Sequence, residues 1–397
     1  MNAVQRAASE RGLRILMISD VYFPRINGVS TSIRNFRKEL ADLGHDVTLI
    51  APRYGPDDEP DASIFRIPSR YIPIDPEDRL MKRRDIAGLE ETLRQSEFDI
   101  IHIQTPFVAH YAGVSLSRRL GIPRVETYHT HFEEYLHHYL PLVPKPWMQR
   151  LARGFNRSQC SDVDGVIVPS QAMLDVLRGY GIERPIEIIP TGVDQIFFRR
   201  GDGAKFRAEH GVPDTRPVLV HVGRLAHEKN IDFLLHMLRE LRAIVPDVLL
   251  VIAGEGPAEK HLRRLAERLE LNGSVRFTGY LDRGSTLLDC YAAGDAFVFS
   301  SRTETQGLVL LEAMAQGTPV VSVSELGTRD ILREGQGALV SPDHTGEFAK
   351  RVAKLLRDSG MRAWLAAAAR HHARNWSSRR FAERKAEFYR KTIHASR

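Results

Sequence analysis

The chain of 397 residues is too long for one compact domain and has the length of two domains of about 150 to 200 residues each. It contains no run of about 18 apolar residues, and its first fourteen residues are polar and charged, so we expect neither a membrane-spanning helix nor a secretory leader. The cysteines Cys160 and Cys290 lie far apart without metal or redox spacing, which predicts reduced thiols in a cytoplasmic protein.

The net charge of +6 is unevenly distributed along the chain. From Lys350 to the end there are 14 Lys and Arg against 3 Asp and Glu, whereas the preceding 349 residues carry 42 against 47. A basic terminal stretch suits a phosphate-rich partner, either nucleic acid or an anionic membrane surface. The same pattern also suits the solvated face of a helix.

In the N-terminal half, apolar runs alternate with helical patterns. The run 14–20 has the composition of a buried parallel strand, and a loop, a helix through Phe36 and Leu40 and a second strand at 46–51 follow it. This order is typical of a doubly wound α/β fold. Further strands are predicted at 64–67, 98–104, 124–128, 163–170 and 186–192.

The alternating pattern stops at about Asp194 to Pro217, a polar stretch, and then restarts. The second run contains a strand at about 216–225, helices at about 231–245 and 259–269, and further apolar strands up to about residue 323. Two such runs predict two Rossmann-like domains with a cleft between them.

The segment Glu304–Gly317 carries the clearest functional signal. A strand ends before Glu304, Gly307 permits a tight turn, and the following apolar run predicts a helix capped by Gly317. In open parallel sheets, ligands bind beyond the carboxyl ends of strands, where helix N-termini present free N–H groups. If helical throughout, Glu304 and Glu312 would be about 12 Å apart, whereas a retaining glycosidase places two carboxylates about 5 Å apart. We therefore interpret them as anchors for two parts of one extended ligand.

A second signal follows the first strand of the second run. Arg224 and Lys229 lie five residues apart at the end of that strand, across a turn into the next helix. Two cations at a strand end suit a diphosphate, because negative charge grows there as a leaving group departs. Taken alone, such a turn with solvated charges is common, so the interpretation depends on the glutamate segment as well.

Several unlinked motifs in one order resemble glycosyltransferase family four, the retaining nucleotide-sugar transferases with the GT-B fold. The motifs are FPRINGVSTSI, TYHTHFEEY, PTGVD, GRLAHEKN, AGEGP, FTGYL and ETQGLVLLEAMAQGTPVV. The resemblance covers essentially the whole chain. It implies an N-terminal acceptor-binding domain at 1–196, a donor-binding domain at 197–376, and a last helix at about 377–397 that crosses back to the N-terminal domain.

The resemblance also implies roles for individual residues. Arg224 and Lys229 would bind the diphosphate, Glu304 would hold the transferred sugar, and Glu312 would bind the ribose. His129 would lie near the reacting bond, so the implied catalytic residues are His129, Glu304, Arg224 and Lys229. The implied donor-binding residues are Gly28, Gly223, Arg224, Lys229, Glu255, Thr305, Gln306, Gly307, Leu308 and Glu312. The family usually has an aromatic residue where this chain has Gln306, which is a departure from its pattern.

The family needs no metal or other cofactor, and the histidines of the N-terminal half lack a metal-binding spacing such as HExxH. We expect His129 to contact a hydroxyl group of the acceptor. Its role as a base is left open, because the departing phosphate can accept the proton in a retaining transfer. Asn27 and His131 are further candidates for contacts with the acceptor.

The predicted acceptor is a membrane lipid. The motifs INGVSTSI, YHTHFEEYLHHY and TETQG resemble the branch of the family that glycosylates diacylglycerol and related lipids. In addition, Trp147, Arg150, Arg153 and Arg157 have the spacing of one helix face. A basic face with an interfacial aromatic residue suits an anionic membrane surface, although an ordinary surface helix has the same pattern.

The sequence therefore predicts a transferase that moves a hexose, glucose from UDP-glucose, to diacylglycerol at the cytoplasmic face of the inner membrane. The alternatives are a polysaccharide, polyprenyl-linked or soluble sugar acceptor with GDP-mannose as a further donor, and a non-catalytic protein that binds sugar nucleotides. We expect no nucleic-acid partner, since the basic C-terminal stretch lacks interleaved aromatic residues of the RNA-binding type. The sequence specifies no oligomeric state.

Overall fold

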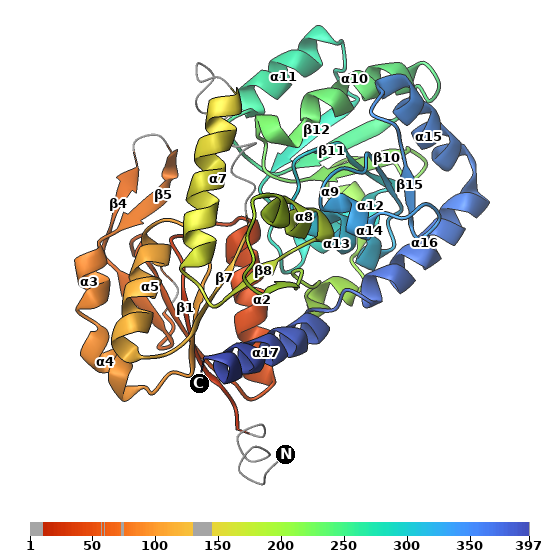
Figure 1. Cartoon of the computed structure of the whole chain (residues 1–397). Coiled ribbons are helices and arrows are strands. Elements are labelled where there is room, and N and C mark those ends of the chain that lie inside the picture. Colours follow the sequence, from red (N-terminus) through yellow and green to blue (C-terminus); the bar gives the residue numbers. More distant parts are fainter. Residues whose placement is uncertain (1–10, 57, 59, 73–74, 130–144, 397) are drawn as a thin grey trace. The chain divides into compact units, whose positions relative to one another are not determined.

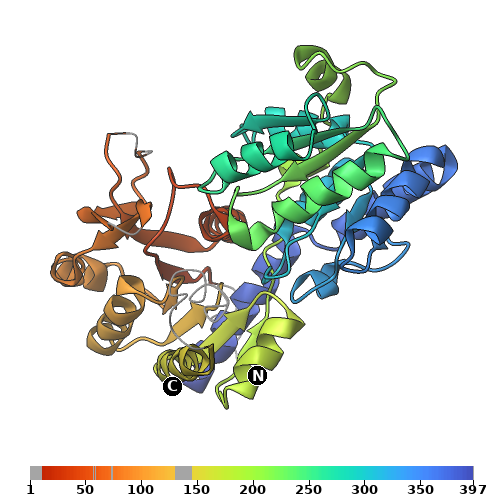
Figure 2. The ribbon, with the colours of Figure 1, turned by 90° about the horizontal axis from the view of Figure 1, so that it is seen from above.

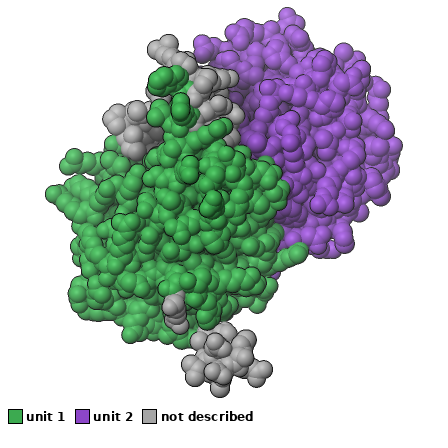
Figure 3. All heavy atoms as spheres, viewed as in Figure 1, with its two compact units in different colours: residues 1–192, 378–397 green, residues 193–377 purple. Residues whose placement is uncertain are grey.

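The computed structural model describes residues 11–56, 58, 60–72, 75–129 and 145–396. The chain divides into two compact units, which Figure 3 shows in different colours. Unit 1 comprises residues 1–192 and 378–397, and unit 2 comprises residues 193–377. The sequence analysis placed the same divisions at 196–197 and at about 376–377.

Unit 1 is built on a seven-stranded parallel sheet in the order β3-β2-β1-β6-β7-β8-β9. The strands are β1 (Arg14–Ile18), β2 (Asp46–Pro52), β3 (Ile64–Ile67), β6 (Ile100–Ile103), β7 (Arg124–Thr127), β8 (Gly165–Val168) and β9 (Ile186–Ile188). The side chains of β1 from Ile15 to Ile18 are all fully buried, because helices cover both faces of a parallel sheet. The predicted strands of this half are thereby confirmed.

Apart from the terminal helix α17, the helices of unit 1 lie between its strands in the chain, as Figure 1 shows. They are α2 (Gly28–Asp42), α3 (Arg83–Ala87), α4 (Glu90–Gln95), α5 (Val108–Leu120), α7 (Lys145–Ser161), α8 (Gln171–Gly179) and the terminal α17 (Ser378–Ala395). An antiparallel hairpin of β4 (Ser69–Ile72) and β5 (Asp75–Met81) was not predicted from the sequence.

The terminal helix α17 packs against α2 within unit 1, which confirms the predicted crossing back. Ser378 donates a hydrogen bond to Glu39 of α2 at 2.6 Å. The Oη atom of Tyr389 lies 2.6 Å from Nδ1 of His102 on β6. Gly165 of β8 leaves room for α17, since a Cβ atom there would lie 2.7 Å from the ring of Phe388.

Unit 2 holds a six-stranded parallel sheet in the order β12-β11-β10-β13-β14-β15. The strands are β10 (Val218–Val222), β11 (Leu249–Ala253), β12 (Val275–Gly279), β13 (Ala296–Phe299), β14 (Val320–Ser322) and β15 (Ala338–Val340). Successive residues of each strand point to opposite faces, so Val218 and Val220 join one core and Leu219 joins the other. The strands therefore lie between two layers of helices (Figure 2).

Most helices of unit 2 follow strands of its sheet. They are η1 (Gln195–Phe198), α9 (Gly203–Glu209), η2 (His227–Lys229), α10 (Ile231–Arg242), α11 (Glu259–Arg268), α12 (Thr286–Ala293), α13 (Leu308–Gln316), α14 (Thr328–Ile331), α15 (Thr345–Arg357) and α16 (Ser359–Arg374). The stretch read as a break between domains thus contains η1 and α9. Phe206 of α9 is 1% exposed and belongs to one of the cores.

Candidate functional site

The site predicted in unit 2 is built from two loops at neighbouring strand ends. Strands β10 and β13 are paired in the sheet, so the loops at their carboxyl ends start side by side. Lys229 lies in η2 after β10, and Glu304 lies in the loop after β13. The Nζ atom of Lys229 and the Oε1 atom of Glu304 are 2.6 Å apart. The structure thus brings these two predicted residues into one ion pair.

Hydrogen bonds from side chains to backbone carbonyls join the two loops. Ser300 Oγ donates to the carbonyl of Asn230 at 2.8 Å, and the side-chain Nδ2 of Asn230 donates to the carbonyl of Ser300 at 3.1 Å. Ser301 donates to the carbonyl of Glu228 at 3.2 Å. Asn230 has a positive φ of 54°, which asparagine tolerates better than most residues. The position of Lys229 is therefore set by the loop around it.

The ion pair determines the charge state of the site. Burial raises the pKa of Glu304, but the charge of Lys229 and hydrogen bonds from Lys229 and Ser301 outweigh it, so the net pKa lies below its ordinary value. His221 at the end of β10 is fully buried, and burial lowers its pKa to about 4. At neutral pH this edge of the sheet therefore presents an ammonium, a carboxylate and a neutral imidazole.

The loop that carries Arg224 lies unusually close to the loop after β11. A Cβ atom on Gly254, whose φ is 132°, would lie 2.0 Å from the carbonyl oxygen of Gly223, and one on Gly256 would lie 2.4 Å from that of Leu225. The backbone N–H of Leu225 donates to the carbonyl of Glu255 at 2.9 Å. The glycines of the AGEGP motif are thus required by this approach.

Helix α13 begins directly after the loop that carries Glu304. Gly307 adopts a left-handed conformation with φ of 96° before Leu308, the first helical residue. Gly317 ends the helix with φ of 80°, which confirms its predicted role as the C-cap. The turn places the N-terminus of α13 directly after the loop of Glu304, and the first N–H groups of a helix have no partner within the regular helical pattern.

Glu312 lies inside α13 and is 1% exposed. Its carboxylate forms an ion pair with Arg283, and its Oε2 atom accepts a hydrogen bond from Tyr291 at 2.9 Å. These partners explain how a carboxylate is tolerated in the apolar helix. Burial alone would lower the pKa of Arg283, but Glu312 reverses the shift and raises it. The predicted contact of Glu312 with a ribose stays a prediction.

Apart from Gly28, the remaining residues predicted to bind a donor lie in unit 2, in or next to these loops. Arg224, Thr305 and Leu308 are half-buried, and Gln306 is buried. Glu255 is exposed, and its Oε1 atom accepts a hydrogen bond from the backbone of Tyr280 at 3.3 Å. Their roles stay predictions, as do those of Gly223 and Gly307.

In unit 1, His129 follows β7, and its Nε2 atom lies 3.2 Å from Oε1 of Gln104, which follows β6. Burial, and secondarily the charge of Lys385, lower the pKa of His129 to about 3. Lys385 comes from α17, is 1% exposed, and lies 3.1 Å above the ring of Phe36. The sequence analysis missed Lys385, because it belongs to a helix whose other basic residues are largely exposed.

Two further predicted residues lie at the start of α2. Asn27 caps this helix by accepting a hydrogen bond from the backbone of Ser30 at 2.9 Å, and Ser30 Oγ accepts one from the backbone of Asn27 at 3.0 Å. Gly28 is exposed, and no atom of the described part of the chain lies within 4 Å of a Cβ placed there. Contacts of both residues with a ligand stay predictions, and His131 lies outside the described residues.

Helix α7 presents the predicted basic face. Trp147, Arg150, Arg153 and Arg157 are all exposed, and the exposed fraction of Trp147 is 71%. Leu151 on the same helix is 68% exposed, whereas Ala152, Asn156, Gln159 and Cys160 are buried.

Within the described ranges, no group of three or more His, Cys, Asp and Glu residues is placed to hold a metal ion. No helix of that part of the chain is long and apolar enough to cross a membrane.

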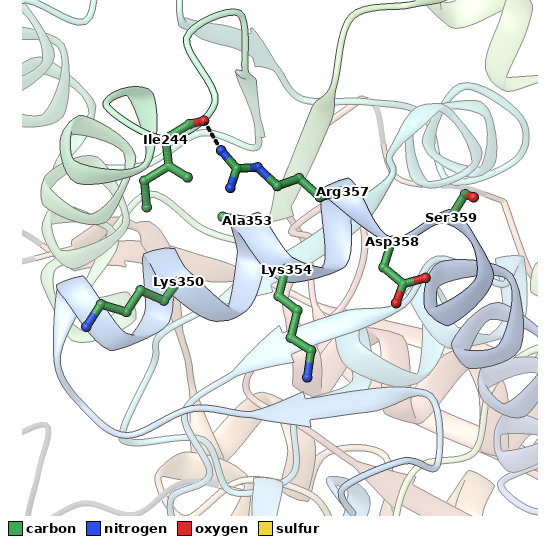
Figure 4. Close-up of a pocket in the computed structure, with 7 residues that line it drawn as sticks. All are labelled: Ile244, Lys350, Ala353, Lys354, Arg357, Asp358 and Ser359. Atoms are coloured by element: carbon green, nitrogen blue, oxygen red, sulfur yellow. Dashed lines mark hydrogen bonds between the residues drawn. The ribbon is translucent and has the colours of Figure 1, made fainter.

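A hollow of about 680 Å³ lies along α15, away from the strand ends described above (Figure 4). It is lined by Ile244, Lys350, Ala353, Lys354, Arg357, Asp358 and Ser359. Arg357 donates a hydrogen bond to the carbonyl of Ile244 at 2.8 Å and so closes one side. Lys350, Lys354 and Arg357, three basic residues of the C-terminal stretch, are exposed on this helix.

Two family models match the chain, and known proteins resemble it. The model described as Glycosyltransferase Family 4 matches residues 26–196, and the one described as Glycosyl transferases group 1 matches residues 202–372. The chain is 35% identical to an alpha-monoglucosyldiacylglycerol synthase of Streptococcus pneumoniae, over 84% of this chain and 76% of that protein. It is 29% identical to a GDP-mannose-dependent alpha-mannosyltransferase of Mycobacterium tuberculosis, over 86% of each.

Solved structures share the fold. HepE of Anabaena, crystallised with UDP, matches with a TM-score of 0.76 at 20% identity, over 96% of this chain and 100% of that chain. Together with the two parallel sheets, this match confirms the predicted GT-B fold class.

The ion pair predicts a pH-dependent loss of stability in the variant Lys229→Met. In the wild type, Glu304 stabilises the fold above its ordinary pKa of 4.5, and this contribution is lost as the pH falls through its lowered pKa. Without Lys229, burial raises the pKa of Glu304, so the variant should be less stable by about 3 kcal/mol at pH 7. The difference in the free energy of unfolding between the wild type and the variant, measured by urea unfolding, should become smaller as the pH falls toward 4.

The control is Lys205→Met, which removes an exposed lysine of the same unit. It should change the free energy of unfolding little at any pH. A deficit in Lys229→Met that is the same at pH 4 and pH 7 would contradict the assigned ion pair.

Proposed function

The chain belongs to glycosyltransferase family 4, and on this premise we propose that it transfers glucose from UDP-glucose to the hydroxyl group of a membrane lipid such as diacylglycerol. The transfer retains the configuration of the sugar and needs no metal ion. The observation that carries the proposal is the ion pair of Lys229 and Glu304, 2.6 Å apart at the carboxyl edge of the sheet. Parallel sheets bind nucleotides at this edge.

The two charges of the pair match the two halves of a sugar diphosphate. A diphosphate would form ion pairs with the ammonium of Lys229 and the guanidinium of Arg224. A sugar hydroxyl would donate a hydrogen bond to the carboxylate of Glu304. Negative charge grows on the diphosphate as it leaves, and two fixed cations stabilise that charge without a metal. The N–H groups at the start of α13 are further donors for the sugar or the phosphates.

The low pKa of His129 bears on the proton transfer. A group with a pKa of about 3 is a weak base at neutral pH, because the best catalytic bases have a pKa close to the working pH. We therefore assign His129 a hydrogen bond to the acceptor or the sugar. The proton of the acceptor hydroxyl passes to an oxygen of the departing diphosphate.

The lipid acceptor is supported by α7 and by one relative. The exposed Trp147 and Leu151 share this helix with Arg150, Arg153 and Arg157, which suits a peripheral position on the anionic cytoplasmic face of a membrane. The relative from S. pneumoniae is by name a synthase of monoglucosyldiacylglycerol. The mycobacterial relative favours the alternative of GDP-mannose as the donor.

A transfer assay with matched donors and acceptors tests the function. UDP-glucose and GDP-mannose are each offered with diacylglycerol in mixed micelles or with a soluble saccharide, and the product is identified by mass spectrometry. We expect glucosyl diacylglycerol from UDP-glucose. In Glu304→Gln the rate should fall by a factor on the order of 100, because the contact acts on the reacting sugar.

Glu325→Gln is the matched control, since Glu325 lies in a largely exposed pair with Arg329 in the same unit. It should leave the rate unchanged. Mannose transfer without glucose transfer would contradict UDP-glucose as the donor. An unchanged rate in Glu304→Gln would contradict the assignment of the donor site to Glu304.

Flotation with vesicles tests the membrane surface. The wild type should float with phosphatidylglycerol vesicles and be released by salt, because exposed charges are screened. Replacing Arg150, Arg153 and Arg157 by alanine should weaken binding by a factor on the order of 100, at about 1 kcal/mol for each charge.

The control removes three exposed cations of α11 in unit 2, Lys260, Arg264 and Arg268. It has the same net charge as the α7 variant and should float like the wild type. Equal flotation of the wild type with neutral and anionic vesicles would contradict the proposed surface.

A further inference from the structure

Unit 1 holds a small cavity at the carboxyl edge of its sheet. Gln104 and His129, which follow β6 and β7, line one side, and Asn156 and Cys160 of α7 line another. The cavity has a volume of about 30 Å³. A cavity of roughly 10–15 Å³ holds one water, so this one has room for two atoms of the size of carbon or oxygen.

Asn156 is the unusual residue of this cavity. It is 1% exposed, and among the residues that the structure describes neither its amide nitrogen nor its amide oxygen has a hydrogen-bond partner. Its neighbour Gln159, on the same buried face of α7, donates to the carbonyl of Pro106 at 2.5 Å. A buried amide without a partner destabilises the fold, and such a group calls for an explanation, one of which is a role at a functional site.

The chemistry of the lining indicates the kind of group that fits. An amide offers both a donor and an acceptor, which is what one hydroxyl group needs. The carboxylate of Glu126 also lines the cavity, but His110 already binds it at 3.0 Å. The apolar side chains of Val29 and Val166 complete the wall and suit a carbon atom. The cavity therefore suits a neutral group of one carbon and one oxygen.

We propose that this cavity binds the hydroxymethyl group of the acceptor and that Asn156 hydrogen-bonds its hydroxyl, so that the enzyme selects primary alcohols. The inference rests on the proposed function and deepens it. The carbon atom of a primary alcohol is bonded to one further carbon, so the CH₂OH group fits the volume of the cavity. The carbon atom of a secondary alcohol is bonded to two further carbons and does not fit. The glycerol arm of 1,2-diacylglycerol and the exocyclic CH₂OH group of a hexose share this chemistry.

Two diacylglycerols with the same acyl chains test the selection. The free hydroxyl is primary in 1,2-diacylglycerol and secondary in 1,3-diacylglycerol. The wild type should use the first with a kcat/KM at least about tenfold higher, since one misfitting carbon in a pocket has roughly this effect. Equal use of the two lipids would overturn the inference.

The variants Asn156→Leu and Asn156→Ala separate binding from a structural role. Asn156→Leu keeps the number and branching of the side-chain heavy atoms and removes the hydrogen bonds, so kcat/KM for 1,2-diacylglycerol should fall about tenfold or more, while the KM for the donor and its hydrolysis without acceptor stay the same. Its melting temperature should not fall, because an unpaired buried amide is removed. Asn156→Ala enlarges the cavity and should reduce the preference for the primary alcohol.

Ser158→Ala, at an exposed position of the same helix, is the control and should behave like the wild type. Unchanged acceptor use in Asn156→Leu would mean that the cavity holds only water. A parallel fall of donor hydrolysis and acceptor use would mean that Asn156 only supports the fold. Either result overturns the inference.

A saccharide pair distinguishes this inference from the proposed lipid function. If the wild type uses neither diacylglycerol, the lipid acceptor is wrong, and the same variants are assayed with methyl glucoside and methyl xyloside. These sugars differ only in the hydroxymethyl group. A wild-type preference for the glucoside that Asn156→Leu abolishes would support the cavity, and equal use of both sugars would overturn it.

Discussion

The ion pair of Lys229 and Glu304 is the interaction on which the account of unit 2 depends. Each partner is a group that a sugar diphosphate needs, and in the free protein each neutralises the other at 2.6 Å. Leaving either one buried alone would be costly, so the pair keeps both side chains charged and in place, and the proposed donor would replace the partner of each. The pairing of β10 with β13 and the hydrogen bonds between their loops set this geometry.

The two units use different chemistry at their strand ends. Unit 2 offers fixed charges, and its second ion pair, of Glu312 and Arg283, is buried beside Tyr291. In unit 1, burial keeps His129 neutral, and the cavity next to it presents the uncharged amide of Asn156. Charged groups suit a nucleoside diphosphate, and neutral hydrogen-bonding groups suit an alcohol. This difference agrees with a donor bound by unit 2 and an acceptor bound by unit 1.

The sequence predicts the fold and part of the site, for identifiable reasons. Apolar runs and glycines are local signals, so the strands, the cap at Gly317 and the loops of Lys229 and Glu304 can be predicted from them. Side chains that are distant in the sequence and meet only in the tertiary structure cannot be paired from local patterns. Arg283 and Tyr291 lie 29 and 21 residues from Glu312, and no pattern links them. Lys385 and Asn156 sit in helices rich in basic residues, where only the packing shows which polar side chains are buried.

The most direct test of the central claim is the affinity of UDP and of UDP-glucose for the wild type and for Glu304→Ala, measured by calorimetry. UDP lacks the glucose that would contact Glu304, so removing the carboxylate only frees Lys229 for the diphosphate. The account predicts that Glu304→Ala binds UDP more tightly than the wild type does, while the additional affinity that glucose gives to UDP-glucose is lost. Weaker or unchanged binding of UDP, with the effect of glucose retained, would contradict it.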